Sequence, residues 1–192
     1  MEIKNAKNFN DNIQVEICKL FVEGFGKDLD AISKNQDKLI KVFTHMFVID
    51  NFYICVIDNK IAGMIACLDK EHYCIKHNIK ILIKHLGLIK GLLANMIIKM
   101  HFTKYPKYSI EISEKTGSIE YVVTNSKYRG KGVAKSIMEY IFSLNMYDDY
   151  ILEVIEGNIN AINVYKKLGF NEAGTQKIYP MNYLYMIKNN VK

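Results

Sequence analysis

The chain has 192 residues, of which 49% are hydrophobic and 24% are charged, with 11 glycines and 2 prolines. This composition is typical of globular proteins and excludes collagen-like and intrinsically disordered classes. The length predicts one domain that spans residues 1–192, because domains most often contain about 100 to 150 residues. The net charge of +6 favours an anionic ligand or surface, but charge alone does not choose between nucleic acid, lipid and small phosphates.

The four cysteines, at positions 18, 55, 67 and 74, form neither a CxxC pair nor a zinc-ligand pattern. We therefore expect no bound metal and a reducing, cytoplasmic setting. Residues 1–10 are polar and lack the apolar core of a signal peptide. The sequence contains no lysine run with interleaved aromatic residues and no nucleic-acid-binding motif, so we expect no nucleic-acid partner.

Hydrophobic periodicity predicts a mixture of strands and helices along the chain. In the first half, the predicted elements are a strand near residues 2–4, helices at 13–25 and 36–47, and a hairpin of strands at 52–57 and 61–68. A helical insertion of about residues 71–107 follows, before the fourth strand. In the second half, the predicted elements are a strand at 118–124, a helix at 133–145, a strand at 150–155, a helix at 158–168 and a strand pair at 170–174 and 183–187.

The insertion contains a strongly apolar stretch, residues 79–100, that could be mistaken for a membrane-spanning helix. Lysines and histidines interrupt this stretch, and charges so spread are costly inside a bilayer. We therefore expect no integral membrane segment and predict an amphipathic helical hairpin with a break near Gly87 or Gly91. Its large apolar side chains are too many to leave exposed, which favours a homodimer contact or a lid over an acceptor pocket.

The strongest local pattern is the run RGKGVA at residues 129–134, between a predicted strand and a predicted helix. Glycines let the backbone approach a ligand, so that several N–H groups and the positive end of the helix converge on an anion. Arg129 is the only arginine in the chain, and a guanidinium binds phosphate oxygens through paired hydrogen bonds. The spacing fits neither a P-loop nor a dinucleotide-binding fingerprint. A turn that uses glycine for geometry alone is the alternative.

A second pattern, the run NINAINVYKKLGF, occupies residues 158–170. Together the two runs resemble the acetyl-CoA site of the GNAT superfamily of N-acetyltransferases, whose motifs have the forms Q/R-x-x-G-x-G/A and N-x-x-A-x-x-x-Y-x-x-x-G-F. The matching residues are Arg129, Gly132, Ala134, Asn158, Ala161, Tyr165, Gly169 and Phe170. The resemblance covers residues 117–187 and implies an α/β fold of the α+β type, with a mixed, mostly antiparallel sheet flanked by helices and splayed in the middle. The chain departs from the family pattern in its long insertion and in Ser126, where relatives usually carry proline.

The resemblance implies an acetyl-CoA-dependent N-acetyltransferase that acts on a primary amine of a small molecule or peptide. It assigns cofactor binding to Val122, Val123, Thr124, Arg129, Gly130, Lys131, Gly132, Val133, Ala134, Lys135, Asn158 and Tyr165. Asn158 also suits the N-cap of its helix. Two alternatives are a CoA-binding sensor without turnover and a peripheral membrane or partner-binding protein on the same scaffold.

The reaction needs a proton acceptor, because an amine with a pKa of about 10 arrives as an ammonium ion, and a proton donor for the departing thiolate. The resemblance places the phenol of Tyr165 beside the CoA sulfur as the donor. Strand alternation places Ser118, Glu120, Val122 and Thr124 on one face. Relatives often carry a catalytic carboxylate on this strand, which makes Glu120 the predicted base. The alternatives are a packing role for Tyr165 and a partly solvated Glu120 without a chemical role.

Overall fold

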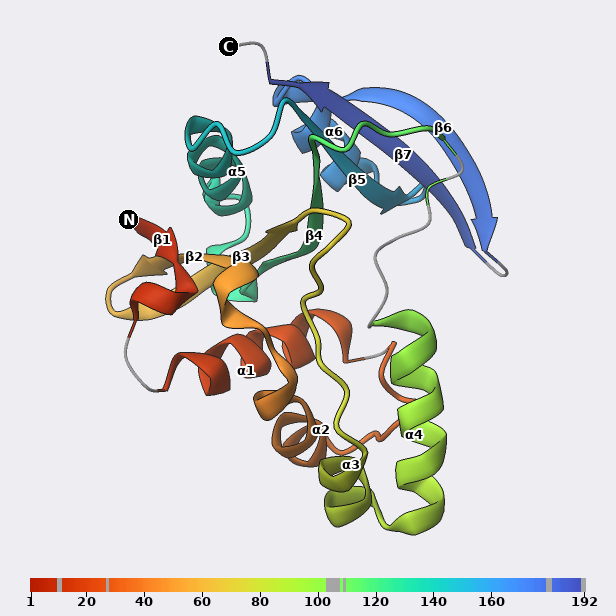
Figure 1. Cartoon of the computed structure of the whole chain (residues 1–192). Coiled ribbons are helices and arrows are strands. Elements are labelled where there is room, and N and C mark those ends of the chain that lie inside the picture. The colour runs from red at the N-terminus through yellow and green to blue at the C-terminus, as the bar shows by residue number, and fades with distance from the viewer. Residues whose placement is uncertain (10–11, 27, 103–107, 109, 179–180, 191–192) are drawn as a thin grey trace.

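The computed structural model describes residues 1–9, 12–26, 28–102, 108, 110–178 and 181–190. In this part of the chain, seven strands form one sheet in the order β1-β2-β3-β4-β5-β7-β6 (Figure 1). The strands are β1 (Glu2–Asn5), β2 (Phe52–Ile57), β3 (Lys60–Leu68), β4 (Thr116–Thr124), β5 (Asp149–Ile155), β6 (Asn171–Ile178) and β7 (Met181–Asn189). All neighbouring strands are antiparallel except β4 and β5. The predicted fold class is therefore confirmed.

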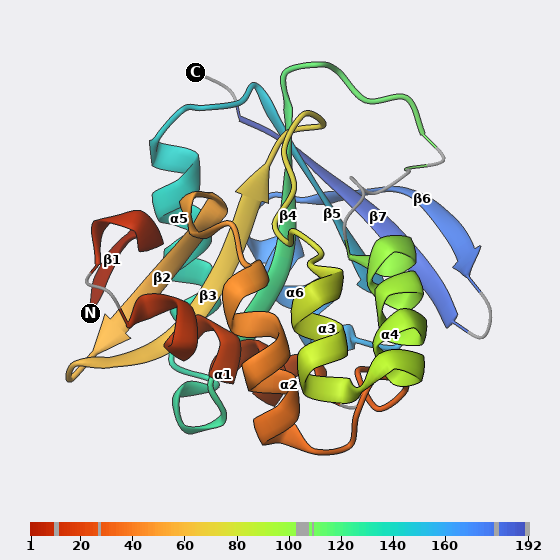
Figure 2. The same cartoon turned by 60° about the horizontal axis from the view of Figure 1, so that its bottom comes forward.

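Helices lie on both sides of the sheet (Figures 1 and 2). On one side are α1 (Ile13–Phe25), α2 (Gln36–Phe43), α3 (Ile79–Leu86) and α4 (Leu88–His101), and on the other are α5 (Val133–Ser143) and α6 (Ile159–Lys167). The sheet thus separates two hydrophobic cores. The α1-side cluster includes Phe21, Phe43, Phe52, Met64 and Ala66, and the α5-side cluster includes Ile65, Ile137, Tyr150, Leu152 and Phe170.

The parallel pairing of β4 with β5 is short. Residues 116–119 of β4 lie opposite residues 149–152 of β5, although both strands continue beyond them. β4 stays paired with β3 up to Thr124, and β5 stays paired with β7 up to Ile155. The two strands therefore separate after Ile119, and the separation leaves the β5-facing backbone groups of β4 without strand partners in the described sheet.

A bulge in β4 follows the point of separation. Tyr121 has a φ of 49°, and the register of β4 with β3 shifts at this point. Tyr121 and Val123 pack on the α1-side cluster, whereas Val122 packs on the α5-side cluster. Glu120 faces the α1 side, because it lies opposite Ala66, a member of the α1-side cluster.

The predicted alternation of β4 is therefore wrong beyond Glu120. Val122 was expected on the same face as Glu120, and the structure places it on the opposite face. The physical reason is the extra residue of the bulge, which sets two consecutive side chains on one face.

The helical insertion precedes β4 as predicted, but it begins later than expected. The helical hairpin turns at Gly87, whose φ is 82°. Residues 71–78 are not helical, because they run beside the chain that enters β2 and form a bridge between Phe47 and Ile75. Residues 103–107 of the predicted insertion lie outside the described part of the chain. None of the described helices combines the length and the apolar character that a bilayer crossing needs.

Other element boundaries also differ from the sequence prediction. The second helix ends at Phe43 and continues as a 3-10 turn to Met46. β6 and β7 are longer than predicted. β6 is an edge strand rich in polar residues, so it lacks the apolar alternation that marks strands in a sequence.

All four cysteines are buried and free of disulfides. Burial raises the pKa of each thiol above its ordinary value, to about 11 for Cys18. They behave as small apolar side chains of the two cores.

Gly63 of β3 allows α5 to approach the sheet closely. A Cβ atom at this position would lie 2.6 Å from Cγ1 of Val133 and 3.0 Å from the carbonyl oxygen of Val123. Because α5 begins at Val133, this contact fixes where the helix starts relative to β4.

We expect Gly63→Ala to lower the free energy of unfolding by about 1–3 kcal/mol, the usual cost of overpacking. The matched control is Gly157→Ala, since a Cβ atom there would meet no other atom within 4 Å. Urea unfolding of both variants measures the difference. Equal stability of the two would mean that α5 moves aside at no cost.

Candidate active site

A cleft of about 790 Å³ opens between β4, the loop that follows it, α5 and α6. It is lined by Val122, Thr124, Tyr128, Arg129, Gly130, Gly132, Val133, Ala134, Lys135, Asn158, Asn160, Ala161, Asn163, Val164, Tyr165 and Lys167. The structure thus brings together both sequence motifs, which lie far apart in the chain. Two residues predicted to bind the cofactor do not line the cleft. The side chain of Val123 points to the α1 side, and Lys131 lies over the ring of Tyr128 at 5.3 Å.

The N-terminus of α5 is open toward this cleft. An asparagine side chain caps α2, α3 and α6, at Asn35, Asn78 and Asn158 respectively. α5 has Gly132 at this position and no side-chain cap from a described residue. The first N–H groups of α5 are therefore available to an anion, which the helix dipole also favours.

Two glycines shape the backbone around this helix end. Gly130 and Gly132 have φ values of 74° and 76°, in the left-handed region that favours glycine. A Cβ atom at either position would meet no protein atom within 4 Å. The space is therefore free for a ligand to approach the backbone. The exposed side chains of Arg129 and Lys135 add positive charge to the same wall.

The loop before this turn is tied to α1. The carboxylate of Glu23 accepts a hydrogen bond from the Ser126 N–H at 2.9 Å and another from the Asn125 side chain at 3.2 Å. Proline has no N–H and could not make the first bond. Serine at position 126 thus gives this chain an anchor for the loop that the usual proline would not.

α6 brings two of the predicted residues to the cleft. The side-chain oxygen of Asn158 accepts a hydrogen bond from the Ala161 N–H at 3.2 Å, so its predicted capping role is confirmed. Tyr165 is 7% exposed, lines the cleft, and its hydroxyl has no hydrogen-bond partner within the described residues. Burial, and to a lesser degree the negative charge of Glu120, raises the pKa of Tyr165 to about 12. The phenol therefore stays protonated at neutral pH.

Glu120 lies on the other side of β4, where the strands separate. Its Oε1 atom accepts hydrogen bonds from the hydroxyl of Ser118 and, at 3.2 Å, from that of Tyr108. Burial raises the pKa of Glu120 to about 7, the charge of Glu153 adds to this, and the two hydrogen bonds oppose it. A carboxylate with this pKa can accept and release a proton near neutral pH.

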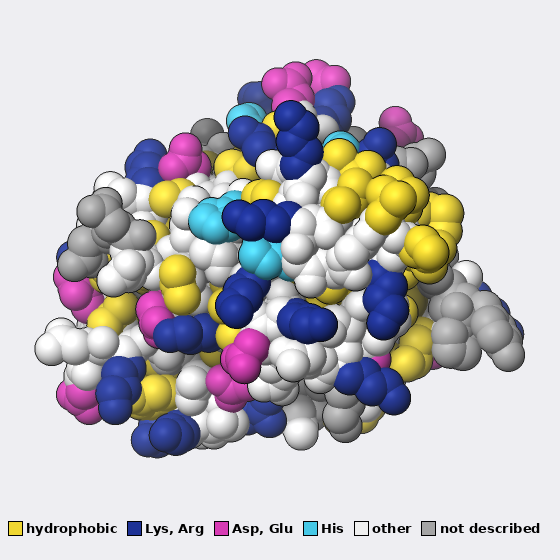
Figure 3. All heavy atoms as spheres, turned by 90° about the horizontal axis from the view of Figure 1, so that it is seen from below, with side chains coloured by type: hydrophobic (Ala, Val, Ile, Leu, Met, Phe, Trp, Pro, Cys, Tyr) yellow, Lys and Arg dark blue, Asp and Glu magenta, His cyan; other side chains and the backbone are white. Residues whose placement is uncertain are grey.

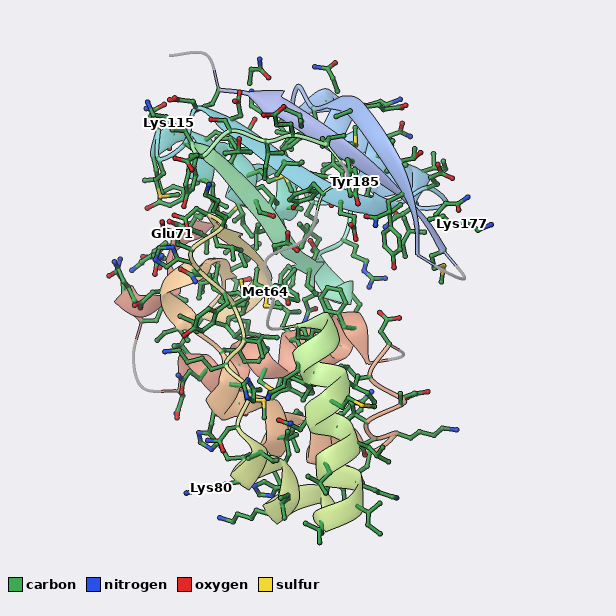
Figure 4. The ribbon with its side chains drawn as sticks, turned by 45° about the vertical axis from the view of Figure 1, so that its right-hand side comes forward. Met64, Glu71, Lys80, Lys115, Lys177 and Tyr185 are labelled. Atoms are coloured by element: carbon green, nitrogen blue, oxygen red, sulfur yellow. The ribbon has the colours of Figure 1, made fainter. Side chains whose placement is uncertain are left out.

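One tyrosine contacts this carboxylate, and a second tyrosine packs against the first. The hydroxyl of Tyr108 lies 2.6 Å from Oγ of Ser118, and its ring meets the ring of Tyr185 edge-on, with centroids 5.2 Å apart. Figure 4 shows Tyr185 beside β7, well away from Lys177 at the outer end of β6. Within the described residues, no group of three or more His, Cys, Asp or Glu side chains could hold a metal ion.

The sequence interpretation missed several residues of this region. On α6 they are Asn160, Asn163, Val164 and Lys167, which are spaced by three and four residues and so share one face of the helix, a different face from that of Tyr165. No local sequence motif marked Tyr108 or Glu23 as part of the site. Each reaches the site only because the chain folds back from a distant segment.

The family model described as "Acetyltransferase (GNAT) family" matches residues 17–170. The chain belongs to the GNAT acetyltransferase family. The match includes β4, the glycine turn, α5 and α6, which together form the cleft. None of the curated proteins matches the sequence.

Solved structures share the fold of this GNAT protein at low sequence identity. An N-acetyltransferase from Staphylococcus aureus Mu50 is 20% identical, with a TM-score of 0.64 over 97% of this chain and 100% of that one. The ribosomal-protein-S18-alanine N-acetyltransferase from Escherichia coli is 11% identical, with a TM-score of 0.56 over 100% of this chain and 94% of that one. The NatC complex bound to Gag peptide and CoA contains a chain that is 17% identical, with a TM-score of 0.54 over 98% and 99% of the two chains.

We expect Gly132→Ala to weaken CoA binding by at least about tenfold, because the new methyl group enters the space in front of the α5 amides. Gly87→Ala is the matched control. Gly87 has a similar φ of 82° and an equally empty surrounding, but it lies in the α3–α4 turn. Both variants place a Cβ atom at a positive φ, and the ψ of 168° at Gly87, against 8° at Gly132, makes the backbone strain larger in the control. Calorimetry with CoA should separate them, and equal affinities would exclude this turn as the phosphate site.

Proposed function

We propose that this GNAT protein is an enzyme that transfers the acetyl group of acetyl-CoA to a primary amine of a small molecule or peptide. The observation that carries the proposal is the arrangement around β4. An open helix end and a buried tyrosine lie on its α5 side, and a half-buried carboxylate with a raised pKa lies on its α1 side. The free, buried cysteines favour a reducing, cytoplasmic setting.

The cleft fits the two chemical parts of CoA. Its pyrophosphate would lie against the N–H groups at the start of α5, with Arg129 and Lys135 as counter-charges. The pantetheine arm would follow the backbone of residues 122–124, where β4 has lost its partner β5. The thioester would then reach the gap between the strands, next to Tyr165.

The acceptor amine would approach from the α1 side, where Glu120 lies. Glu120 takes one proton from the ammonium group, directly or through water, and the neutral nitrogen attacks the acetyl carbonyl carbon. The new C–N bond forms, and the C–S bond breaks. Tyr165 donates its phenolic proton to the departing sulfur, and the second proton of the amine returns the tyrosine to its neutral form through solvent. Glu120 then releases the proton it accepted to solvent. Products are the acetamide and free CoA.

Turnover of acetyl-CoA with a panel of primary amines tests this function. We expect free CoA and acetylated amine in equal amounts, measured by chromatography and mass spectrometry. Tight CoA binding without turnover on any amine would instead identify a sensor that keeps the nucleotide site.

The pH dependence of kcat/KM tests Glu120 as the base. Since only its carboxylate accepts a proton, activity should rise with pH through about 7, the pKa of the group. Glu153→Gln should move this rise to lower pH, because the charge of Glu153 raises the pKa of Glu120. Ser118→Ala should move it to higher pH, because it removes a hydrogen bond that lowers the pKa. Shifts in other directions would exclude Glu120.

Glu120→Gln should remove this rise and keep the fold. In the folded protein the pKa of Glu120 lies above its ordinary value of 4.5, so its ionisation between pH 4.5 and about 7 lowers the free energy of unfolding. The glutamine variant lacks this loss. Above pH 7 it should therefore be at least as stable as the wild type, which separates a lost base from a lost fold.

We expect Tyr165→Phe to lower kcat by about 10² to 10⁴-fold, the usual effect of removing a general acid. CoA affinity should change little, because the ring stays in place. The matched control is Tyr150→Phe, a buried tyrosine of the same cluster whose hydroxyl donates to the Ile141 carbonyl at 3.3 Å, outside the cleft. Stopped-flow and steady-state kinetics compare them. Unchanged turnover in Tyr165→Phe would mean that the thiolate leaves without this proton.

A further inference from the structure

α4 carries apolar side chains on its exposed face as well as on its buried face. Its inward face consists of Gly91, Ala94 and Ile98, and the last two are 2% and 0% exposed. The opposite face carries Leu88, Ile89, Leu92, Leu93 and Met96, which are 62%, 75%, 48%, 53% and 58% exposed. These five residues recur at spacings of three and four, so they form one continuous stripe along the helix. We call it the outer stripe of α4.

The charged side chains of the hairpin segment itself are all basic. The sequence contains no aspartate or glutamate between Glu71 and Glu111. In the same interval the described lysines are Lys76, Lys80, Lys84, Lys90 and Lys99. Lys90 and Lys99 lie on α4 beside the stripe, and Lys80 and Lys84 share one face of α3.

The hairpin lies at one end of the molecule. α3 and α4 form its lower end in Figure 1, and Lys80 lies near that end in Figure 4. Seen from below, hydrophobic side chains gather at one side of this face, with lysine and histidine side chains beside them (Figure 3). Exposed apolar side chains flanked by lysines can enter a membrane interface while the lysines stay at the level of the headgroups.

The charge pattern decides between the possible occupants. A symmetric contact with a second copy would bring the same lysines of both copies together, with no carboxylate from either hairpin to pair with them. Nucleic acid would match the charge, but it offers no surface for five exposed aliphatic side chains. An anionic lipid surface suits both the apolar stripe and the lysines. The stripe enters the acyl boundary, and the lysines reach the lipid phosphates.

We propose that the α3–α4 hairpin docks this protein on anionic membranes, with the outer stripe of α4 lying in the plane of the interface. The helix does not cross the bilayer. This surface is separate from the cleft between β4, α5 and α6, so the proposal stands independently of the enzymatic one.

Vesicle sedimentation with the full-length protein tests the docking. We expect binding to vesicles of phosphatidylcholine mixed with phosphatidylglycerol, and at least about tenfold weaker binding to phosphatidylcholine alone. Binding to the mixed vesicles should fall as salt rises, because the lysine contribution is screened. No binding to the mixed vesicles, or equal binding to both kinds, would overturn the proposal.

Surface variants assign the contact to the hairpin. Ile89→Ser with Leu93→Ser, and separately Lys84→Glu with Lys90→Glu, should each weaken binding at least about tenfold. The matched controls are Leu144→Ser and Lys177→Glu, exposed residues on other elements, which should bind as the wild type does. All the substituted side chains are exposed, so circular dichroism should find each variant folded.

Two further results would overturn the docking surface. Light scattering could find a dimer that the serine variant dissociates, which would identify a second copy as the occupant. Alternatively, a short DNA duplex could bind with the same dependence on Lys84 and Lys90 but none on Ile89 and Leu93. A protein that stays monomeric and does not bind DNA in this way supports the lipid surface.

Discussion

The short parallel contact between β4 and β5 is the constraint on which the rest of the site depends. It joins the two halves of the sheet from Thr116 to Ile119 and then ends, while each strand stays paired on its other side. Buried backbone donors and acceptors are costly to leave unmatched. In the proposed complex, the amides of the pantetheine arm take the place of the missing strand. The backbone groups of β4 that lose their β5 partners are then the groups that bind the substrate.

The bulge at Tyr121 adds a second constraint. A tyrosine with positive φ is strained, and the surrounding structure must compensate. Its ring packs against Phe21, Phe25 and Phe52, with centroids 5.8, 5.9 and 6.2 Å apart. Such aromatic pairs contribute about 0.5–1.5 kcal/mol each beyond their burial. The aromatic core thus holds a backbone turn that directs Glu120 to one side of the sheet and Val122 to the other.

Features that depend on neighbouring residues could be predicted from the sequence. The glycine turn and the Asn158 cap follow from short runs, the position of Tyr165 follows from the family resemblance, and the strand positions along the chain follow from periodicity. Features that depend on distant contacts could not. Tyr108 reaches Glu120 from the end of the insertion, Glu23 reaches Ser126 from α1, and neither contact leaves a local pattern. The bulge could not be predicted either, because apolar and polar residues alternate normally in the β4 sequence and the irregularity appears only in its pairing with β3.

The burial of the four cysteines has a consequence for chemistry at sulfur. Disulfide reagents and maleimides react with thiolates, and every thiol in this chain has a raised pKa and lies inside a core. The folded protein should therefore be nearly silent toward a chromogenic disulfide. Colour that develops during turnover would then report the liberated coenzyme alone. The same reagent, added along a denaturant series without substrate, would record the opening of both cores through the protein's own sulfur atoms.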